Sequence, residues 1–561
     1  MKKSLVNILK KSITARHLLR FWRLKFAQPS WNEIFADERL LWQEALSAPK
    51  KKRVLIATSI GAHLPSVILE SLLSAALTLR DAEVHVLLCD KVLPACMDCS
   101  IDITIREKEL AKHGPQKNLC ASCYKYTNGM FRSLGVQVHR YSDFLSSDDF
   151  SHAQSIASEI DLSNLKEYAL DGIAVGEHAL AGALRFYARG DLEKEVHATT
   201  IAGRYLRAAL LTMWAVRRLL NSHTFDAAVF HHGIYVPQGL VGEVCRSKKL
   251  RVVNWNVAYK KSCFIFSHGD TYHHTLMGED VKHWESVSLN KDREAELMDY
   301  LKSRWYGSKD WIWFHEKPRE NLAEIAKEIG VDFSKPCVGL LTNVMWDAQL
   351  HYPANAFSNM LEWVVATIEY FRKRTDIQLV IRVHPAEIWG KNPSRQKLVD
   401  EINARFESLP ANVFIIAPEA RISTYAVMEQ CDSVIIYGTK TGVELTSMGI
   451  PVIVAGEAWV RNKGITLDAS SPEHYFKILD TLPLGKRLDE SVMVRARKYA
   501  FHFFFRRMIP LPFMKPVKGW PLYSIGIRSL SELRAGNFKG LDVICDGILK
   551  NTPFIYPHEN S

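Results

Sequence analysis

The chain has 561 residues, too many for one ordinary hydrophobic core, so its length predicts two large domains with appended segments. Apolar residues make up 47% and charged residues 24% of the chain, which excludes a largely disordered protein. No stretch reaches the roughly 18 consecutive apolar residues of a membrane-spanning helix, and the lysine-rich start lacks the pattern of a signal peptide. We therefore expect a cytoplasmic protein.

The net charge of +11 is concentrated in two segments. Residues 1–30 contain eight Lys or Arg and no acid, residues 495–518 contain seven and no acid, and both interleave the charges with bulky apolar groups. Such segments suit the anionic inner face of a membrane, where the protein would sit peripherally. The alternative is a basic helix that packs on its own domain. Because no recognised binding motif accompanies the charge, we expect no nucleic-acid partner.

An alternation of strands and helices begins at residue 53. RVLIAT is typical of a short buried strand, VILESLLSAALTLR of a helix and AEVHVLLCD of the next strand, which together predict a βαβ unit. A helical region follows over about residues 175–221, and DAAVFHHG and LRVVNWNV are the next strand-like runs. We expect a basic helical segment at residues 1–48 and a doubly wound domain at residues 49–308.

The same alternation starts again at residue 337. CVGLLTN, IQLVIRVHP, NVFIIAP, SVIIYG and PVIVAG are strand-like, with helix-like segments between them. These elements predict a second doubly wound domain at residues 309–488, followed by a basic and aromatic helical tail at residues 489–561. The predicted fold class is α/β, with two tandem Rossmann-like domains and a cleft between them that faces the carboxyl ends of the strands.

Polar residues just past the strand ends of the second domain are the candidate ligand-binding groups. In YGTKTG, small and hydroxyl-bearing residues open a helix, where backbone N–H groups favour a phosphate; the alternative is an ordinary capped helix. The residues predicted to bind the ligand are Asn343, Arg382, His384, Tyr437, Thr439, Thr441, Gly442 and Glu444.

Two of these segments carry a family resemblance. RVHPAE and the later YGTKTGVELTSMGIPVIVAG resemble the C-terminal half of bacterial capsule polysaccharide synthesis transferases, over roughly residues 335–470. The resemblance implies a two-Rossmann glycosyltransferase fold of the GT-B type and a nucleotide-sugar donor held by His384-Pro385, Thr439 to Gly442 and Glu444. The chain departs from the pattern at Thr441, where relatives often have Ser, a change that keeps a hydroxyl.

The first domain supplies candidates for a catalytic base. His63 lies in the loop after the first strand, a position where many inverting two-domain transferases carry a base histidine, and imidazole titrates close to neutral pH. The alternative is a solvated loop histidine. His232, at another strand end, and Asp347, in the second domain, are the other candidates for this role.

Four cysteines form two closely spaced pairs, Cys96-x-x-Cys99 and Cys120-x-x-Cys123. Four thiolates at this spacing can close a tetrahedral zinc site, and reduced thiols are expected in the cytoplasm. We therefore predict a structural zinc in an insertion at residues 94–125. An iron–sulfur cluster or unligated cysteines are the alternatives.

Together these features predict a glycosyltransferase that moves a sugar from a nucleotide-sugar donor to a glycan or lipid-linked acceptor in surface polysaccharide synthesis. A base histidine favours an inverting reaction, and because no Asp-x-Asp motif is present the prediction requires no catalytic metal. The rival functions are a nucleotide-sugar epimerase or a glycerophosphotransferase of the same fold, and a non-catalytic polysaccharide export or binding protein.

Overall fold

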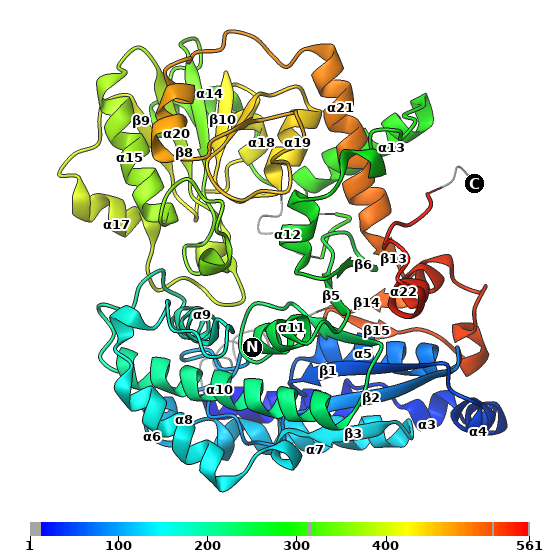
Figure 1. Ribbon diagram of the computed structural model, residues 1–561. Helices are drawn as coiled ribbons and strands as arrows, with labels where there is room; N and C mark the ends of the chain where they lie inside the picture. The colour runs from blue at the N-terminus through cyan, green and yellow to red at the C-terminus, as the bar shows by residue number, and fades with distance from the viewer. Residues whose placement is uncertain (1–12, 307, 312–316, 519–520, 559–561) are drawn as a thin grey trace, which may run out of the picture. The chain divides into compact units, whose positions relative to one another are not determined.

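The computed structural model describes residues 13–306, 308–311, 317–518 and 521–558 (Figure 1). The chain forms two compact units. The first unit contains residues 1–187, 191–272 and 507–561, and the second contains residues 188–190 and 273–506. Among the helices of the described residues, none is both long and apolar enough to cross a bilayer.

The first unit is built on a seven-stranded sheet with the strand order β13-β6-β5-β4-β1-β2-β3. Strands β1 to β5 run parallel, whereas β6 and β13 are antiparallel to their neighbours. Its strands are β1 (Lys52–Ser59), β2 (Ala82–Leu88), β3 (Gln137–Arg140), β4 (Ala227–His231), β5 (Val252–Val257), β6 (Cys263–His268) and β13 (Ile509–Pro510), and β14 (Met514–Pro516) and β15 (Tyr523–Ile525) form a separate hairpin.

Helices of the first unit connect and cover this sheet. The connection from β1 to β2 is α5, whose fifteen residues are all buried, as the continuous apolar run predicts. The helices are α2 (Ile13–Phe26), α3 (Trp31–Ile34), α4 (Arg39–Ser47), α5 (Leu64–Thr78), α6 (Glu107–His113), α7 (Ala121–Ser133), α8 (Ser147–Glu159), α9 (Val175–Tyr187), α10 (Ala198–Ser222), α11 (Gln238–Ser247) and α22 (Lys539–Lys550).

The second unit is built on a six-stranded parallel sheet with the order β12-β11-β10-β7-β8-β9. Its core lies between this sheet and helices such as α15, around Trp363 and Phe371. The strands are β7 (Cys337–Leu341), β8 (Gln378–Arg382), β9 (Val413–Ile416), β10 (Ser433–Ile436), β11 (Val452–Val454) and β12 (Leu467–Asp468). The helices include α12 (Tyr272–Met277), α13 (Lys291–Trp305), α14 (Leu322–Ile329), α15 (Met360–Lys373), α16 (Ala386–Trp389), α17 (Leu398–Arg405), α18 (Thr424–Met428), α19 (Thr441–Ser447), α20 (Pro472–Leu479) and α21 (Glu490–Phe501).

The prediction of two α/β units is confirmed, with a parallel sheet in the second and two antiparallel edge strands, β6 and β13, in the first. The predicted boundaries at 308/309 and 488/489 are not those of the units. The second unit begins at residue 273 because α13 packs with α21, where Arg497 forms an ion pair with Glu294 (Figure 1). The predicted tail is divided between the units: residues 489–506 belong to the second and residues 507–561 return to the first.

The two basic and aromatic segments differ in the burial of their aromatic side chains. In residues 495–518, the rings of Phe501, Phe503, Phe504 and Phe505 are buried. Charged neighbours such as Arg497 form ion pairs inside the second unit. This segment is therefore a packing element of its own protein, which is the alternative that its composition left open. The N-terminal helix α2 exposes its aromatic side chains instead; the predicted helical residues before 13 lie outside the described residues.

Candidate functional site

The sheet of the second unit has one topological switch point, between β7 and β10. From β7 the chain proceeds outward through β8 and β9, and it then returns to the other side of β7 to place β10 and β11. Ligands of open α/β sheets bind at such a point, outside the carboxyl ends of the strands. Here Asn343, after β7, accepts a hydrogen bond from the backbone N–H of Gly438, after β10, over 3.4 Å. The two loops that flank the switch point are thus joined.

His384 lies at the end of β8, beside this point. Its backbone N–H donates to the Thr342 hydroxyl at 3.0 Å, and its ring Nδ1 accepts a hydrogen bond from the N–H of Ala386 at 3.0 Å. Burial, together with the positive charges of Lys440 and Arg382, lowers the pKa of His384 to about 4. At neutral pH His384 is therefore a neutral imidazole with its proton on Nε2, which makes Nε2 a hydrogen-bond donor rather than a cation or a base.

Lys440, Thr439 and Thr441 follow β10 on the same edge of the sheet. The two threonine hydroxyls lie 3.1 Å apart. Lys440 Nζ lies 3.1 Å from Glu444 Oε1, and its charge acts on His384. Burial and the charge of Arg304 lower the pKa of Lys440. The edge therefore combines one ammonium group, one imidazole N–H and two hydroxyls, a set of donors that suits phosphate oxygens. Lys440 lies within the segment from Thr439 to Gly442 that the resemblance implicated, although it was not among the residues predicted to bind the ligand.

The Glu444 side chain is the centre of a buried ion-pair network and is only 1% exposed. Oε1 forms an ion pair with Arg304, whose Nε lies 2.9 Å away, and accepts a hydrogen bond from Lys440, and Oε2 accepts from the Tyr425 hydroxyl. Burial alone would raise the pKa of Glu444, but the charges of Arg304 and Lys440 hold it below its usual value. Glu444 therefore positions Lys440, and its contact with sugar hydroxyls stays a prediction.

Arg382, Tyr437 and Gly442 are also structural. The Arg382 guanidinium donates to the carbonyl oxygens of Ala417 at 2.5 Å and Ala420 at 3.1 Å, and it holds the loop after β9. Tyr437 is part of the core, stacks on Trp363 and donates to a backbone carbonyl. A Cβ on Gly442 would lie 2.6 Å from Ile436 Cδ1, so this glycine allows α19 to pack closely on β10. These contacts give all three residues a structural role, and their predicted contact with the ligand stays a prediction.

The first unit repeats the arrangement at its own switch point, between β1 and β4. The loop after β1 brings His63, and the end of β4 brings His231. Their imidazole rings stack with centroids 4.7 Å apart and planes at 25°. His63 Nδ1 is 2.7 Å from the Ser66 hydroxyl in the first turn of α5. Both rings are thus held in place at the carboxyl edge of the sheet.

His231 connects this edge to a buried acid. Its Nε2–H donates to Asn256 Oδ1 at 3.1 Å, and its ring lies 4.8 Å from that of Trp255. The Trp255 indole N–H donates to Glu70 Oε1 at 2.9 Å. Glu70 is fully buried, and this burial raises its pKa to about 7, against the opposing effect of its hydrogen bonds. A buried acid that titrates near neutral pH is typical of functional sites, although sequence reasoning passed over it because it lies inside an apolar helix.

The other two candidates for the catalytic base are placed differently. His232 adopts a left-handed backbone with a φ of 69°, and its ring lies 5.0 Å from that of Tyr235 and, edge-on, 5.6 Å from that of His231. Asp347 is exposed in the loop after β7 in the second unit. Of the three predicted residues, His63 stacks on the His231 ring and His232 meets the same ring edge-on, whereas Asp347 belongs to the other unit.

The four paired cysteines come from two segments of the first unit: Cys96 and Cys99 lie in the loop after β2, and Cys120 and Cys123 lie where a π-helix (Gln116–Cys120) joins α7. Cys99 donates a hydrogen bond that lowers the pKa of the Cys96 thiol, and burial raises the pKa of Cys120 and of Cys123. The four thiols are not among the side-chain groups whose ligand atoms gather within 4.8 Å in the described part of the chain. The two cysteine-bearing segments would have to move closer together to hold zinc. A zinc site here therefore stays a prediction.

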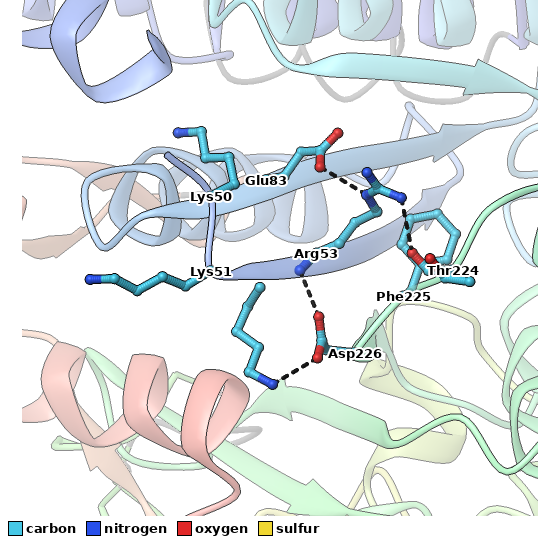
Figure 2. Close-up of a pocket in the computed structure, with 8 residues that line it drawn as sticks. Lys50, Lys51, Arg53, Glu83, Thr224, Phe225 and Asp226 are labelled. Atoms are coloured by element: carbon cyan, nitrogen blue, oxygen red, sulfur yellow. Dashed lines mark hydrogen bonds and ion pairs between the residues drawn. The ribbon is translucent and has the colours of Figure 1, made fainter. Parts of the chain in front are cut away.

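A pocket of about 350 Å³ opens at the opposite, amino-terminal edge of the first sheet (Figure 2). Two of its cations are paired across it, because Arg53 binds Glu83 at 2.8 Å and Lys52 binds Asp226 at 2.8 Å, while Lys50 and Lys51 line it as well. The pocket lies at the strand ends away from the edge where open α/β sheets bind ligands. The two switch points are the better candidates.

No protein-family model matches the chain, and no curated protein matches it. Among solved structures, KpsC of Thermosulfurimonas dismutans, a beta Kdo 2,4 transferase, is similar over 49% of this chain and 79% of its own, with 12% identity and a TM-score of 0.33. The UDP-GlcNAc 2-epimerase of Neisseria meningitidis bound to UDP-GlcNAc is similar over 80% of this chain and 95% of its own, with 9% identity and a TM-score of 0.22. Likenesses at this level assign no function to this chain.

Proposed function

We propose that this protein is a glycosyltransferase that uses a nucleotide-sugar donor, with the donor at the switch point of the second unit and the acceptor at that of the first. The observation that carries the proposal is the pairing, in one chain, of a phosphate-type set of donors at one switch point with a stacked histidine pair at the other. The motif resemblance to capsule polysaccharide transferases supports the same function.

The donor half of the reaction needs groups that stabilise a departing nucleotide phosphate. Lys440 supplies a positive charge, and His384 supplies a neutral N–H donor from Nε2. Thr439 and Thr441 add hydroxyls, and Asn343 holds the loops on either side of the switch point together. Such groups stabilise negative charge most strongly as it develops on the leaving phosphate.

The acceptor half needs a base. An acceptor hydroxyl would attack the anomeric carbon of the donor sugar and form a new C–O bond, while the bond from that carbon to the phosphate oxygen breaks. The phosphate leaves with the electron pair, and the hydroxyl proton passes to Nε2 of His63. This role requires His63 to carry its own proton on Nδ1 and to donate it to Ser66. The product of such a displacement has inverted stereochemistry.

The direct test is nucleotide release from candidate nucleotide sugars, measured with and without glycan acceptor. A transferase releases nucleotide together with a new glycosidic bond, and both need the acceptor. An epimerase would convert its donor without acceptor, a glycerophosphotransferase would need a nucleotide-activated polyol, and a binding protein would release nothing. Nucleotide release at the same rate with and without acceptor would refute the proposal. Undiminished sugar transfer by both the Lys440→Met and the His63→Ala variants would also refute it.

A further inference from the structure

Helix α2 packs on the first unit through a face that includes Arg20 and His17. Arg20 forms an ion pair with Asp98, in the loop between Cys96 and Cys99. His17 Nε2–H donates to the carbonyl oxygen of Thr104 at 2.6 Å, one turn earlier on the same face of the helix. These polar contacts dock α2 on the first unit together with the buried Leu24 and an edge contact of the Phe21 ring with Tyr126.

The opposite face of α2 is apolar and turned to solvent. Leu18 is 60% exposed, Trp22 52% and Phe26 62%, and the rings of Trp22 and Phe26 stack with centroids 5.1 Å apart. Leu19 and Phe21 are also exposed. We call Leu18, Leu19, Phe21, Trp22 and Phe26, with the exposed Arg23 and Lys25 among them, the outer face of α2.

This arrangement is the reverse of an ordinary surface helix, which buries its apolar stripe. The aromatic residues of the 495–518 segment show that this chain can bury such side chains when they serve its own packing. A continuous row of leucine and aromatic side chains on one exposed helix face instead marks a surface that another body covers.

The charge of the outer face indicates what covers it. Arg23 and Lys25 are exposed beside Trp22 and Phe26, and residues 1–30 contain no acid. Leucine and aromatic side chains with flanking basic groups are the composition of helices that lie in the interface of anionic membranes. Trp and the basic side chains also suit the headgroup level, where the surface potential attracts cations.

We propose that the outer face of α2 docks on a bilayer that contains anionic phospholipid, with Leu18, Trp22 and Phe26 at the boundary of the acyl chains and Arg23 and Lys25 against headgroup phosphates. The proposal concerns attachment and stands independently of the proposed activity. It assigns the surface to one helix, whereas the composition alone had implicated both basic segments.

Co-flotation with vesicles tests the proposal on the full chain. One set contains phosphatidylcholine with phosphatidylglycerol, and the matched set contains phosphatidylcholine alone. We expect binding to the anionic set that weakens as salt is added, because exposed charges are screened. The double substitution Trp22→Gln and Phe26→Gln should lower the partition coefficient about tenfold or more, since two aromatic side chains no longer leave water.

Two further variants separate the contributions. Arg23→Glu with Lys25→Glu should abolish the preference for anionic vesicles. Val196→Gln is the matched control, because Val196 is 90% exposed in the first unit but lies outside the outer face, and it should bind as the unchanged chain does. Circular dichroism checks that each variant is folded.

Three outcomes would overturn the proposal. These are no flotation of the unchanged chain, equal flotation of the Trp22→Gln/Phe26→Gln variant, and equal binding to neutral and anionic vesicles. If sedimentation shows a dimer that only this variant dissociates, and no vesicle binding occurs, a second copy of the chain covers the face instead.

Discussion

The imidazole of His63 lies on that of His231 with the ring centroids 4.7 Å apart, although the two residues come from different loops of the first unit. The pair occupies the switch point between β1 and β4, and His231 is fixed in turn by Asn256 and Trp255. A base whose ring is held by stacking and by Ser66 needs little reorganisation before it accepts a proton.

His63→Ala should lower turnover roughly 100- to 10,000-fold, the usual contribution of a general base. Nucleotide affinity should stay unchanged, because the proposed donor groups belong to the other unit. Turnover and nucleotide binding are measured on the same preparation. His232→Ala serves as the matched control and should retain most of the activity; the reverse result would move the base to His232.

Glu70 should make the stability of the first unit depend on pH. Burial raises its pKa from 4.5 to about 7, so the folded state holds this proton more tightly than the unfolded chain does. The stabilisation is complete below pH 4.5 and is lost as the pH rises to 7, a change of about 3 kcal/mol. Glu70→Gln, which still accepts from Trp255, should remove this loss. Urea unfolding at several pH values measures it, and parallel curves for both proteins would contradict the assignment.

Lys440→Met should weaken nucleotide binding by about 1.5–3 kcal/mol, the contribution of a hydrogen bond to a charged group. His384→Ala should act in the same direction and less strongly, because its N–H is neutral. Calorimetric titration with the nucleotide of the best donor gives the affinities. Lys477→Met on α20 removes an exposed charge from the same unit and is the control; equal losses in both variants would indicate a non-specific charge effect.

Glu444→Ala should destabilise the second unit by about 3–5 kcal/mol, because it removes one of the two buried carboxylates, with Asp310, that offset the charges of Arg304 and Lys440. Glu473→Ala, at an exposed acid of α20, should change the stability by less than about 0.5 kcal/mol. Urea unfolding compares the two. A stable Glu444→Ala protein that has lost only nucleotide binding would indicate that Glu444 contacts the ligand.

Elemental analysis of the purified chain should give about one zinc per molecule, and Cys99→Ser or Cys120→Ser should lower it. Cys263→Ser is the control, since Cys263 lies in β6 and is buried apart from the pairs. Removal of the metal should lower the melting temperature, because zinc would link the loop after β2 to the start of α7. Metal-free protein of full stability would refute the prediction.

The strands and long helices could be predicted because each is a local apolar pattern, as RVLIAT and the α5 run show. The direction in which each side chain points could not be predicted from such local patterns. Tyr437 and Glu444 follow the same strand as Thr439, yet one enters the core and the other meets Arg304, which lies far upstream in the chain. Position after a strand end does not reveal a partner that the fold brings from another element. For the same reason, the sequence did not reveal Glu70 beneath Trp255.

The return of residues 507–561 to the first unit has a consequence for biosynthesis. The second unit is nearly continuous in sequence, whereas the first lacks β13, β14, β15 and α22 until the end of the chain has been made. Until then β6 has an unpaired edge, and Arg251 lacks the carbonyl groups of Gly547 and Ile548 that it binds in the finished protein. On the ribosome the second unit can therefore complete its sheet first, and the half-made first unit is the species that chaperones would have to protect.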